Sequence, residues 1–357
     1  MTDIRYRRFE KKDKESLLAL FEAAFGKKKD LRRWEWEFLD GPSPGLVVIA
    51  ESDGGIVGHY AVIPRDFKVK DSFIRGGLVV DVMTHPDYGR RGIFAQCGVE
   101  AFRYAEQGGL SMLVGFPNEA AIRGHLKLKW IELGTLRVRA RPLKVSGLLK
   151  AIGRTRNVPV VFESVANIVI SVINGIMLGE KTSGLSVEWY SSERLEAVLP
   201  DIENLAIKSM KSFVVCNARS RDWISWRLSD PDGKTLVLVL RDPGHGEMVG
   251  FCAMRIETKD EIKICAIMDV VAKEWNPRIL GILIREGLRR AIHENSELVI
   301  MLDSPRLSHQ IPLFGIWMPP TPKKLRFIVR QIGDQKLPDE VYELGNWHLE
   351  LIDHDVF

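Results

Sequence analysis

The spacing of apolar residues changes repeatedly over the first 144 positions, and each change marks a predicted element. Apolar residues at helical spacing predict helices, whereas alternation and short apolar runs between turn residues predict strands. The strongest turn signal, Ser52-Asp53-Gly54-Gly55, predicts a hairpin. The predicted order is a strand at 4–9, helices at 16–25 and 27–39, strands at 46–51, 56–63 and 78–84, a helix from 93, a strand at 111–115, a helix at 119–129 and strands over 130–139.

Residues 145–184 interrupt this order with apolar stretches at 148–152 and 160–178. Polar residues inside the second stretch make it too polar for a predicted membrane span, so we expect a packed helical linker and no integral membrane segment. The alternative interpretation is contact of residues 146–178 with a membrane surface, which three basic residues would help: Lys150, Arg154 and Arg156.

From residue 185 onward the chain repeats features of its first part about 190 positions later, a period far longer than that of a solenoid. Trp36 and its surroundings are echoed at Trp226, and Val80-Asp81-Val82 is echoed at Met268-Asp269-Val270. The sequence therefore predicts two related domains, at 1–144 and 185–357, joined by the linker 145–184. Residues 314–317 and 346–351 are expected to complete the sheet of the second domain.

One stretch of the first domain combines a strand, a basic glycine loop and a helix. The apolar strand 78–84 ends in turn formers, and Tyr88-Gly89-Arg90-Arg91-Gly92 then precedes a helix that starts at Ile93. A helix start has N–H groups without partners and a partial positive charge, and glycines let a ligand approach closely. The pattern predicts a phosphate or pyrophosphate site. The alternative interpretation is an ordinary strand-turn-helix with a solvated arginine pair.

Two common phosphate loops do not fit this stretch. A P-loop needs Lys-Ser or Lys-Thr after its last glycine, and Gly92-Ile93-Phe94 offers neither. A dinucleotide-binding fingerprint needs three glycines directly after a first strand, whereas this loop has too few glycines and lies deeper in the chain.

The stretch instead resembles motif A of the GNAT superfamily of acyl-CoA N-acyltransferases. The matching residues are Pro86, Tyr88, Arg91, Gly92 and Ile93. Gly89 stands where the family has Arg or Gln, and Phe94 stands where it has a small residue, so the ring of Phe94 must point away from the pyrophosphate. The element order over residues 1 to about 144 is also the GNAT order.

This resemblance implies the α+β fold of that family. It predicts two tandem GNAT-like domains with mixed, mostly antiparallel sheets that are flanked by helices. The second domain is expected to be degenerate, because residues 273–280, which replace the basic loop, contain no glycine that would cradle a phosphate.

The resemblance also implies that acetyl-CoA, or another acyl-CoA, binds as co-substrate. Its pantetheine arm would lie along the central strand at Val82, Met83 and Thr84 and meet the side chain of Asn118. Ordinary ladder pairing is the alternative for the strand residues, and a helix cap is the alternative for Asn118. The pyrophosphate would contact Gly89, Arg90, Arg91, Gly92, Ile93 and Phe94.

Two residues are candidates for proton transfer. His125 occupies the place of the tyrosine that protonates the leaving thiolate in this family, although a lone histidine is more often a packing residue. Asp81 is the carboxylate best placed to deprotonate the amine. However, Asp269 stands at the matching position of the domain without a loop, so a structural role would explain both aspartates. A water chain from another residue is the alternative base.

Composition narrows the choice of function. The 357 residues include 51 Lys and Arg and 47 Asp and Glu, and the formal charge of +4 suits an anionic co-substrate without suggesting nucleic acid. The four cysteines are scattered and lack metal-ligand spacing, so we expect reduced core thiols in a cytoplasmic protein without a metal.

These observations predict an N-acyltransferase that moves an acetyl or other short acyl group from acyl-CoA to a primary amine of a small molecule such as an amino sugar. One alternative is a non-catalytic protein that binds acyl-CoA or a small ligand on the same scaffold and acts in regulation. Another is a FemAB-like aminoacyl transferase, against which the absence of a basic tract counts.

Overall fold

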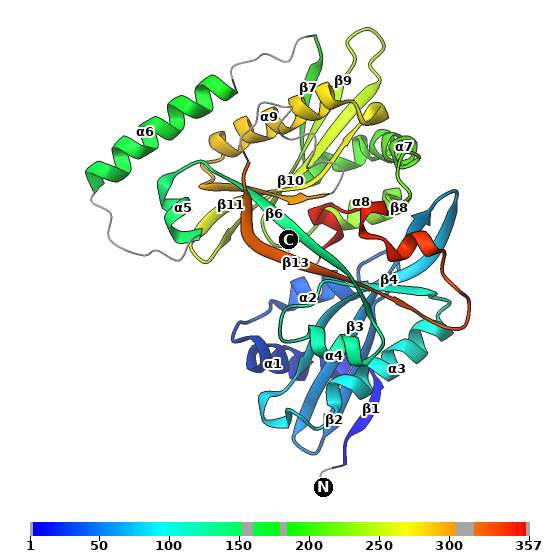
Figure 1. Cartoon of the computed structure of the whole chain (residues 1–357). Helices are drawn as coiled ribbons and strands as arrows, with labels where there is room; N and C mark the ends of the chain where they lie inside the picture. Colours follow the sequence, from blue (N-terminus) through cyan, green and yellow to red (C-terminus); the bar gives the residue numbers. More distant parts are fainter. Residues whose placement is uncertain (1–2, 152–159, 179–183, 305–317, 355–357) are drawn as a thin grey trace. The chain divides into compact units, whose positions relative to one another are not determined.

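A computed structural model describes residues 3–151, 160–178, 184–304 and 318–354 of the protein (Figure 1). The chain forms two compact units. Unit 1 comprises Met1–Thr135, Val214–Ala218 and Leu325–Trp347, and unit 2 comprises Leu136–Phe213, Arg219–Lys324 and His348–Phe357. The units differ from the predicted segments 1–144, 145–184 and 185–357, because short stretches of the second half of the chain belong to unit 1.

Unit 1 is built on a mixed sheet with the strand order β1-β2-β3-β4-β5-β13. The pair β4–β5 is parallel and the other neighbours are antiparallel. A further strand, β8, pairs with the end of β3. The bounds are β1 Arg5–Arg8, β2 Leu46–Ser52, β3 Gly55–Val69, β4 Ser72–Thr84, β5 Met112–Gly115, β8 Val215–Asn217 and β13 Pro320–Gln331.

The helices of unit 1 follow the predicted order. The first ends at Gly26, whose φ of 67° suits a left-handed cap, as predicted. The third packs an apolar stripe onto β2 and β3. This packing requires Gly58, because a Cβ atom there would lie 2.4 Å from the side chain of Ile93. The bounds are α1 Lys14–Phe25, α2 Leu31–Phe38, α3 Ile93–Gln107 and α4 Ile122–Lys127.

Unit 2 repeats this architecture with the strand order β7-β9-β10-β11-β12-β6, in which β11–β12 is the parallel pair. Gly250 repeats the role of Gly58, since its Cβ would lie 2.8 Å from Ile279. The bounds are β6 Ile131–Pro142, β7 Ser186–Ser191, β9 Lys234–Arg241, β10 Met248–Lys259, β11 Ile262–Ala272, β12 Leu298–Asp303, α5 Val145–Ala151, α6 Val160–Met177, α7 Leu199–Met210, α8 Arg221–Leu228 and α9 Pro277–His293.

Each sheet ends on a strand from the other half of the sequence. β13 pairs with β5 in unit 1, and the last residues of β6 pair with β12 in unit 2. The prediction that residues 346–351 complete the second sheet is wrong, because β14 (Trp347–His348) pairs with β8, whose other neighbour is β3. Residues 314–317 lie outside the described part of the chain. Both sheets are mixed, mostly antiparallel and flanked by helices, as predicted.

The two apolar stretches after residue 144 form α5 and α6. No helix among the described residues is long and apolar enough to cross a membrane. Two asparagines of α6 face the protein: Asn167 accepts a hydrogen bond from the Val145 amide, and Asn174 accepts one from Arg141. The opposite face is exposed and apolar, so contact with a membrane surface stays a prediction. Its residues are Val165, Ile168, Val169, Val172 and Ile173.

Candidate functional site

The loop before α3 leaves a run of main-chain N–H groups without acceptors. The Tyr88 amide donates to the His85 carbonyl and the Gly89 amide donates to the Pro86 carbonyl, which closes the turn. The next main-chain hydrogen bond is donated by the Gln96 amide to the Gly92 carbonyl, so the amides of residues 90–94 have no acceptor within the described chain. The predicted contact of the Gly89 amide with a ligand therefore requires its hydrogen bond to Pro86 to break. The amides of residues 90–94 are available to a ligand without such a change.

The surface of this loop is exposed and basic. Residues 89–92 are all exposed. The Arg91 guanidinium stacks 4.7 Å from the centre of the Tyr88 ring, which leaves its outward edge available, and Arg90 is exposed beside it. Positive φ angles of 62° at Arg90 and 79° at Gly92 bend the chain into the kind of turn that forms anion-binding concavities. The loop therefore has both the donors and the charge for a diphosphate.

The corresponding helix of unit 2 has no such donors. Its first residue is Pro277, which lacks an N–H, and the side chain of Asn276 accepts hydrogen bonds from the amides of Arg278 and Ile279. The start of α9 is thus capped by the protein itself. This difference supports the prediction of a degenerate second domain.

Beside the free loop, β4 carries a bulge and separates from β5. Pairing with β3 jumps from His59–Met83 to Ala61–Val80, so Asp81 and Val82 face a single residue, and Asp81 has a φ of 47°. The parallel pairing with β5 ends at Val79–Gly115, whereas β4 continues to Thr84. On the β5 side, the edge of β4 at the predicted pantetheine residues Val82, Met83 and Thr84 therefore has no strand partner in the part of the chain that the structure describes. The hydroxyl oxygen of Thr84 is buried without a hydrogen-bond partner in the described residues.

An ionic cluster holds the bulge. The Lys29 ammonium contacts the Asp81 carboxylate and lies 2.5 Å from Glu37 Oε2. Burial raises the pKa of Glu37 to about 7, although the nearby Lys29 opposes this shift. The two carboxylates raise the pKa of Lys29 despite its burial, so it stays charged. Sequence reasoning missed Lys29 and Glu37. The available signal was a pair of charged residues, Arg33 and Glu37, spaced one turn apart among the aromatic residues of α2.

His59 supports the same bulge from β3. Its Nδ1 atom lies 2.6 Å from the Asp81 carbonyl oxygen. Because a carbonyl only accepts, Nδ1 carries the proton and donates it. Burial lowers the pKa of His59, which keeps the ring neutral. The shape of the bulge thus depends on a neutral histidine and on the Lys29 ion pair.

The structure places His125 in an aromatic pocket of unit 1. The ring is only 3% exposed and packs edge-on against Tyr60, Phe94 and Trp130. Burial lowers its pKa to about 4. A neutral imidazole is a weak acid, so this position favours a packing role over the predicted donation of a proton to a thiolate.

Phe94 is directed toward the same pocket. A Cβ atom on Gly124 would lie 2.5 Å from the Phe94 ring, so the ring occupies the space that the glycine leaves. The departure from the motif at Phe94 is therefore matched by Gly124 on α4. The side chain points toward α4, as predicted, which leaves the exposed loop uncovered.

Asn118 caps the turn that leads into α4, whereas the alternative interpretation placed it as the cap of the helix itself. Its Oδ1 atom accepts hydrogen bonds from the amides of Ala120 and Ala121. The residue is exposed, and its amide nitrogen has no hydrogen bond among the described residues. The predicted contact with pantetheine would use that nitrogen and stays a prediction.

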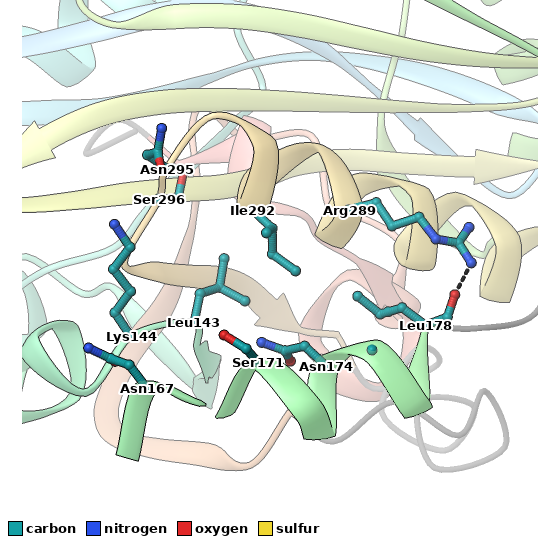
Figure 2. Close-up of a pocket in the computed structure, with 11 residues that line it drawn as sticks. Leu143, Lys144, Asn167, Ser171, Asn174, Leu178, Arg289, Ile292, Asn295 and Ser296 are labelled. Carbon is teal, nitrogen blue, oxygen red and sulfur yellow. Dashed lines mark hydrogen bonds between the residues drawn. The ribbon is translucent and has the colours of Figure 1, made fainter. Parts of the chain in front are cut away.

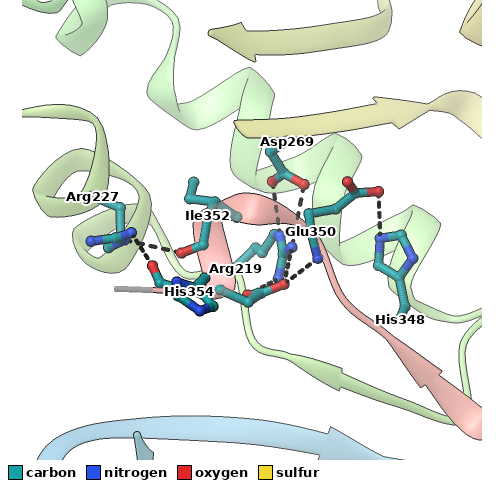
Figure 3. A network of polar contacts seen from close by, with 8 residues as sticks. Arg219, Arg227, Asp269, His348, Glu350, Ile352 and His354 are labelled. Atoms are coloured by element: carbon teal, nitrogen blue, oxygen red, sulfur yellow. Dashed lines mark hydrogen bonds and ion pairs between the residues drawn. The ribbon is translucent and has the colours of Figure 1, made fainter. Parts of the chain in front are cut away.

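The matching aspartate of unit 2 is part of a different cluster (Figure 3). Arg219 forms ion pairs with Asp269 at 2.9 Å and with Asp353 at 3.1 Å, and all three side chains are buried. The turn Leu351–Asp353, which supplies Asp353, packs against β11. Asp81 and Asp269 thus both anchor a central strand through a cation, which supports the structural interpretation of the pair.

The four cysteines are buried free thiols. Burial raises the pKa of Cys97 to about 12 and likewise that of Cys265, and it raises the pKa of Cys252. Such thiols are poor nucleophiles. Among the described residues no group of His, Cys, Asp and Glu is arranged to hold a metal ion.

Comparison with protein families matched residues 5–126 to the model described as "Acetyltransferase (GNAT) domain". No curated protein sequence matched the chain. Among solved structures, N-myristoyltransferase of Saccharomyces cerevisiae with bound myristoyl-CoA is similar at a TM-score of 0.65 and 12% identity, covering 92% of this chain and 79% of that one.

Two further solved structures are similar to this chain. A probable N-acyltransferase of Enterococcus faecalis V583 has a TM-score of 0.65 at 11% identity and covers 93% of this chain and 73% of that one. A tandem GNAT protein from the clavulanic acid biosynthesis pathway has a TM-score of 0.62 at 11% identity, with coverage of 94% and 100%. Residues 5–126 therefore match the GNAT acetyltransferase family model, and the chain as a whole has the fold of a tandem GNAT protein.

Proposed function

We propose that this protein is an acyl-CoA-dependent N-acyltransferase. The group moved is an acetyl or other short acyl chain, and the acceptor is a primary amine of a small molecule such as an amino sugar. The observation that carries the proposal is the run of free amides at residues 90–94 beside the open edge of β4. The bound myristoyl-CoA of the yeast structure and the family-model match support the same class of co-substrate.

The residues of unit 1 fit this co-substrate. The amides of residues 90–94, with Arg90 and Arg91, would hold the diphosphate. The open edge of β4 at Val82, Met83 and Thr84 would hold the pantetheine arm, as an added strand pairs with a free edge. Acyl-CoA supplies an activated thioester from which the acyl group passes directly to the amine. The buried cysteines, with their raised pKa values, support transfer without an acyl-enzyme.

Proton transfer from the amine needs a base whose pKa lies near neutrality. Glu37, with a pKa of about 7, meets this requirement and shares Lys29 with Asp81 at the bulge. Asp81 has one carboxylate oxygen held by Lys29, and its backbone shapes the strand. We therefore assign the base to Glu37 and a positioning role to Asp81. The roles first predicted for Asp81 and His125 have not been tested.

The pH dependence of kcat/KM separates these assignments. The wild type is expected to lose activity as the pH falls through about 7, where Glu37 becomes protonated. Glu37→Gln should remove this acidic limb and lower the rate about a hundred-fold, within the usual contribution of a general base. Asp81→Asn should keep the limb but move it to lower pH, because asparagine tolerates a positive φ and the lost Asp81 charge no longer helps to raise the pKa of Glu37. If the acidic limb of the kcat/KM profile is unchanged in Glu37→Gln and absent in Asp81→Asn, Asp81 is the general base.

Titration calorimetry with acetyl-CoA, followed by thiol release with a panel of amines, tests the proposal. Binding together with amine-dependent release of CoA is the expected result. Binding without release for any amine would favour the alternative of a regulatory protein that binds acyl-CoA. Absence of binding would overturn the assignment of the loop.

A further inference from the structure

Unit 2 contains a cavity of about 630 Å³ between α6 and α9 (Figure 2). We call it the α6–α9 cavity. It lies in the unit whose helix start is self-capped, so the acyl-CoA site of unit 1 does not account for it. Its volume is in the range of small-molecule sites, which are typically about 300 to 1,000 Å³. Nothing in the proposed N-acyltransferase mechanism uses it.

The lining is mixed: three aliphatic side chains stand among polar ones, which besides Lys144 and Ser296 are Asn167, Ser171, Asn174, Arg289 and Asn295. Lys144 and Ser296 lie at one end, which we call the polar end, and Leu143, Ile292 and Leu178 continue from them along the cavity (Figure 2). The main-chain amide of Lys144 donates to the carbonyl of Glu297, which fixes the start of the polar end next to Ser296. The arrangement suits a ligand with one polar head and one aliphatic body.

The charge of the lining is positive. Lys144 has no ion-pair partner among the described residues, and the lining contains no carboxylate. The other cation, Arg289, is neutralised by Glu286 and donates to the Leu178 carbonyl. The single uncompensated charge is therefore the ammonium at the polar end, which favours an anionic head group.

Ser296 provides a second, independent observation. It is only 1% exposed, and its hydroxyl has no hydrogen-bond partner among the described residues. Buried hydroxyl groups without a partner are uncommon in folded proteins, because their desolvation is not compensated. A ligand oxygen at the polar end would accept this hydrogen bond.

The side chains that line the cavity also indicate the chemistry of the rest of the ligand. Among the described residues that line the cavity none is aromatic, so they offer a nucleobase or another ring no stacking partner. Leu143, Leu178 and Ile292 offer aliphatic surface instead. We propose that the α6–α9 cavity binds an aliphatic carboxylate, with the carboxylate at Lys144 and Ser296 and the chain along the three aliphatic side chains.

Titration calorimetry of the full-length protein with decanoate, below its micelle concentration, tests this proposal. Decanol has the same chain without the charge, and decyltrimethylammonium has the opposite charge. Decanoate is expected to bind at least about ten-fold more tightly than either, which is roughly the effect of one charge-assisted hydrogen bond. Equal binding of decanoate and decanol, or no binding of decanoate, would overturn the proposal.

Three variants locate the site. Lys144→Met keeps the aliphatic stem and removes the charge, and Ser296→Ala removes the hydroxyl, so each should weaken decanoate about five- to ten-fold. Gly175→Phe places a ring at the cavity wall, where a Cβ atom meets nothing within 4 Å, and should abolish binding without disturbing α6. Lys211→Met, on an exposed lysine at the end of α7, is the control that should bind like the wild type.

These outcomes are independent of the proposed enzyme. Acetyl-CoA binding to unit 1 is expected to be the same in the wild type, Lys144→Met and Gly175→Phe. If decanoate binds Lys144→Met, Ser296→Ala and Gly175→Phe as it binds the wild type, the ligand lies elsewhere and the assignment of the cavity is wrong. Unchanged thermal unfolding of Gly175→Phe would show that its loss of binding comes from filling the cavity.

Discussion

A Gly92→Asp variant is expected to bind acetyl-CoA at least about a hundred-fold more weakly than the wild type while remaining folded. Gly92 precedes the first turn of α3, among the amides assigned to the diphosphate. A carboxylate there would lie within a few ångströms of a doubly charged group, and repulsion at that distance near a protein surface amounts to several kcal/mol. Titration calorimetry measures the loss directly.

The fold should survive this change. A Cβ atom on Gly92 meets nothing within 4 Å, so the cost is limited to the left-handed backbone, with φ of 79°. That conformation costs a non-glycine residue roughly 1–2 kcal/mol, and Asp is among the residues that tolerate it best. Thermal unfolding followed by circular dichroism is therefore expected to shift by only a few degrees.

The other end of α3 supplies a matched control. Gly109 also has a left-handed backbone, with φ of 75°, and open space around its Cβ position. Gly109→Asp adds the same charge with the same backbone strain, but far from the free amides along the helix. It should bind acetyl-CoA as the wild type does. Equal losses in both variants would indicate a general effect of charge or strain, and the loop would not be the site.

The features of this site that were predictable from sequence are local ones. The strand, the glycine loop and the start of α3 lie within about 25 consecutive residues, and each leaves its own mark on the sequence. Even the unusual residue Phe94 allowed a correct prediction, because its ring had to turn away from the loop. The partner that accepts the ring, Gly124, was not recognised, since nothing in the spacing connects the two positions.

The features that were missed depend on pairing between distant residues. β13 joins β5 over more than 200 positions, and β6 joins β12 over more than 150, so neither exchange leaves a local pattern. The same holds for Lys29, which reaches Asp81 only when α2 packs against the bulge. Asp81 was recognised as a candidate but its ionic partners were not, and those partners change the role that we assign to it.

Unit 2 shows what the central aspartate does where no loop is available, and it leads to the second large prediction. Arg219→Met is expected to destabilise the protein by about 3–5 kcal/mol near pH 7, the usual cost of removing one partner from a buried ion pair. Asp269 and Asp353 would then be buried without their shared cation (Figure 3). Urea unfolding followed by circular dichroism measures the change.

The sign of the pH dependence identifies the cause of this loss. Burial raises the pKa of Asp269 even with Arg219 present, so the folded state holds a proton more readily than the unfolded state. Such a group contributes stability that is complete below its unfolded pKa and is lost as the pH rises. Without Arg219 the pKa would rise further. The destabilisation of Arg219→Met should therefore be small near pH 4 and grow toward pH 7.

Glu350 tests the same argument about buried charge, but here the substitution is expected to stabilise the protein as the pH rises. It is fully buried among Asp269, Asp353, Arg219 and His348, and burial raises its pKa well above the usual value. Its proton is therefore another source of stability that declines as the pH rises. Glu350→Gln cannot ionise, so it should equal the wild type near pH 4 and become relatively more stable above that, by up to about 1.4 kcal/mol per pH unit. If instead Arg219→Met and Glu350→Gln lose the same stability at every pH, packing volume and not buried charge controls this cluster.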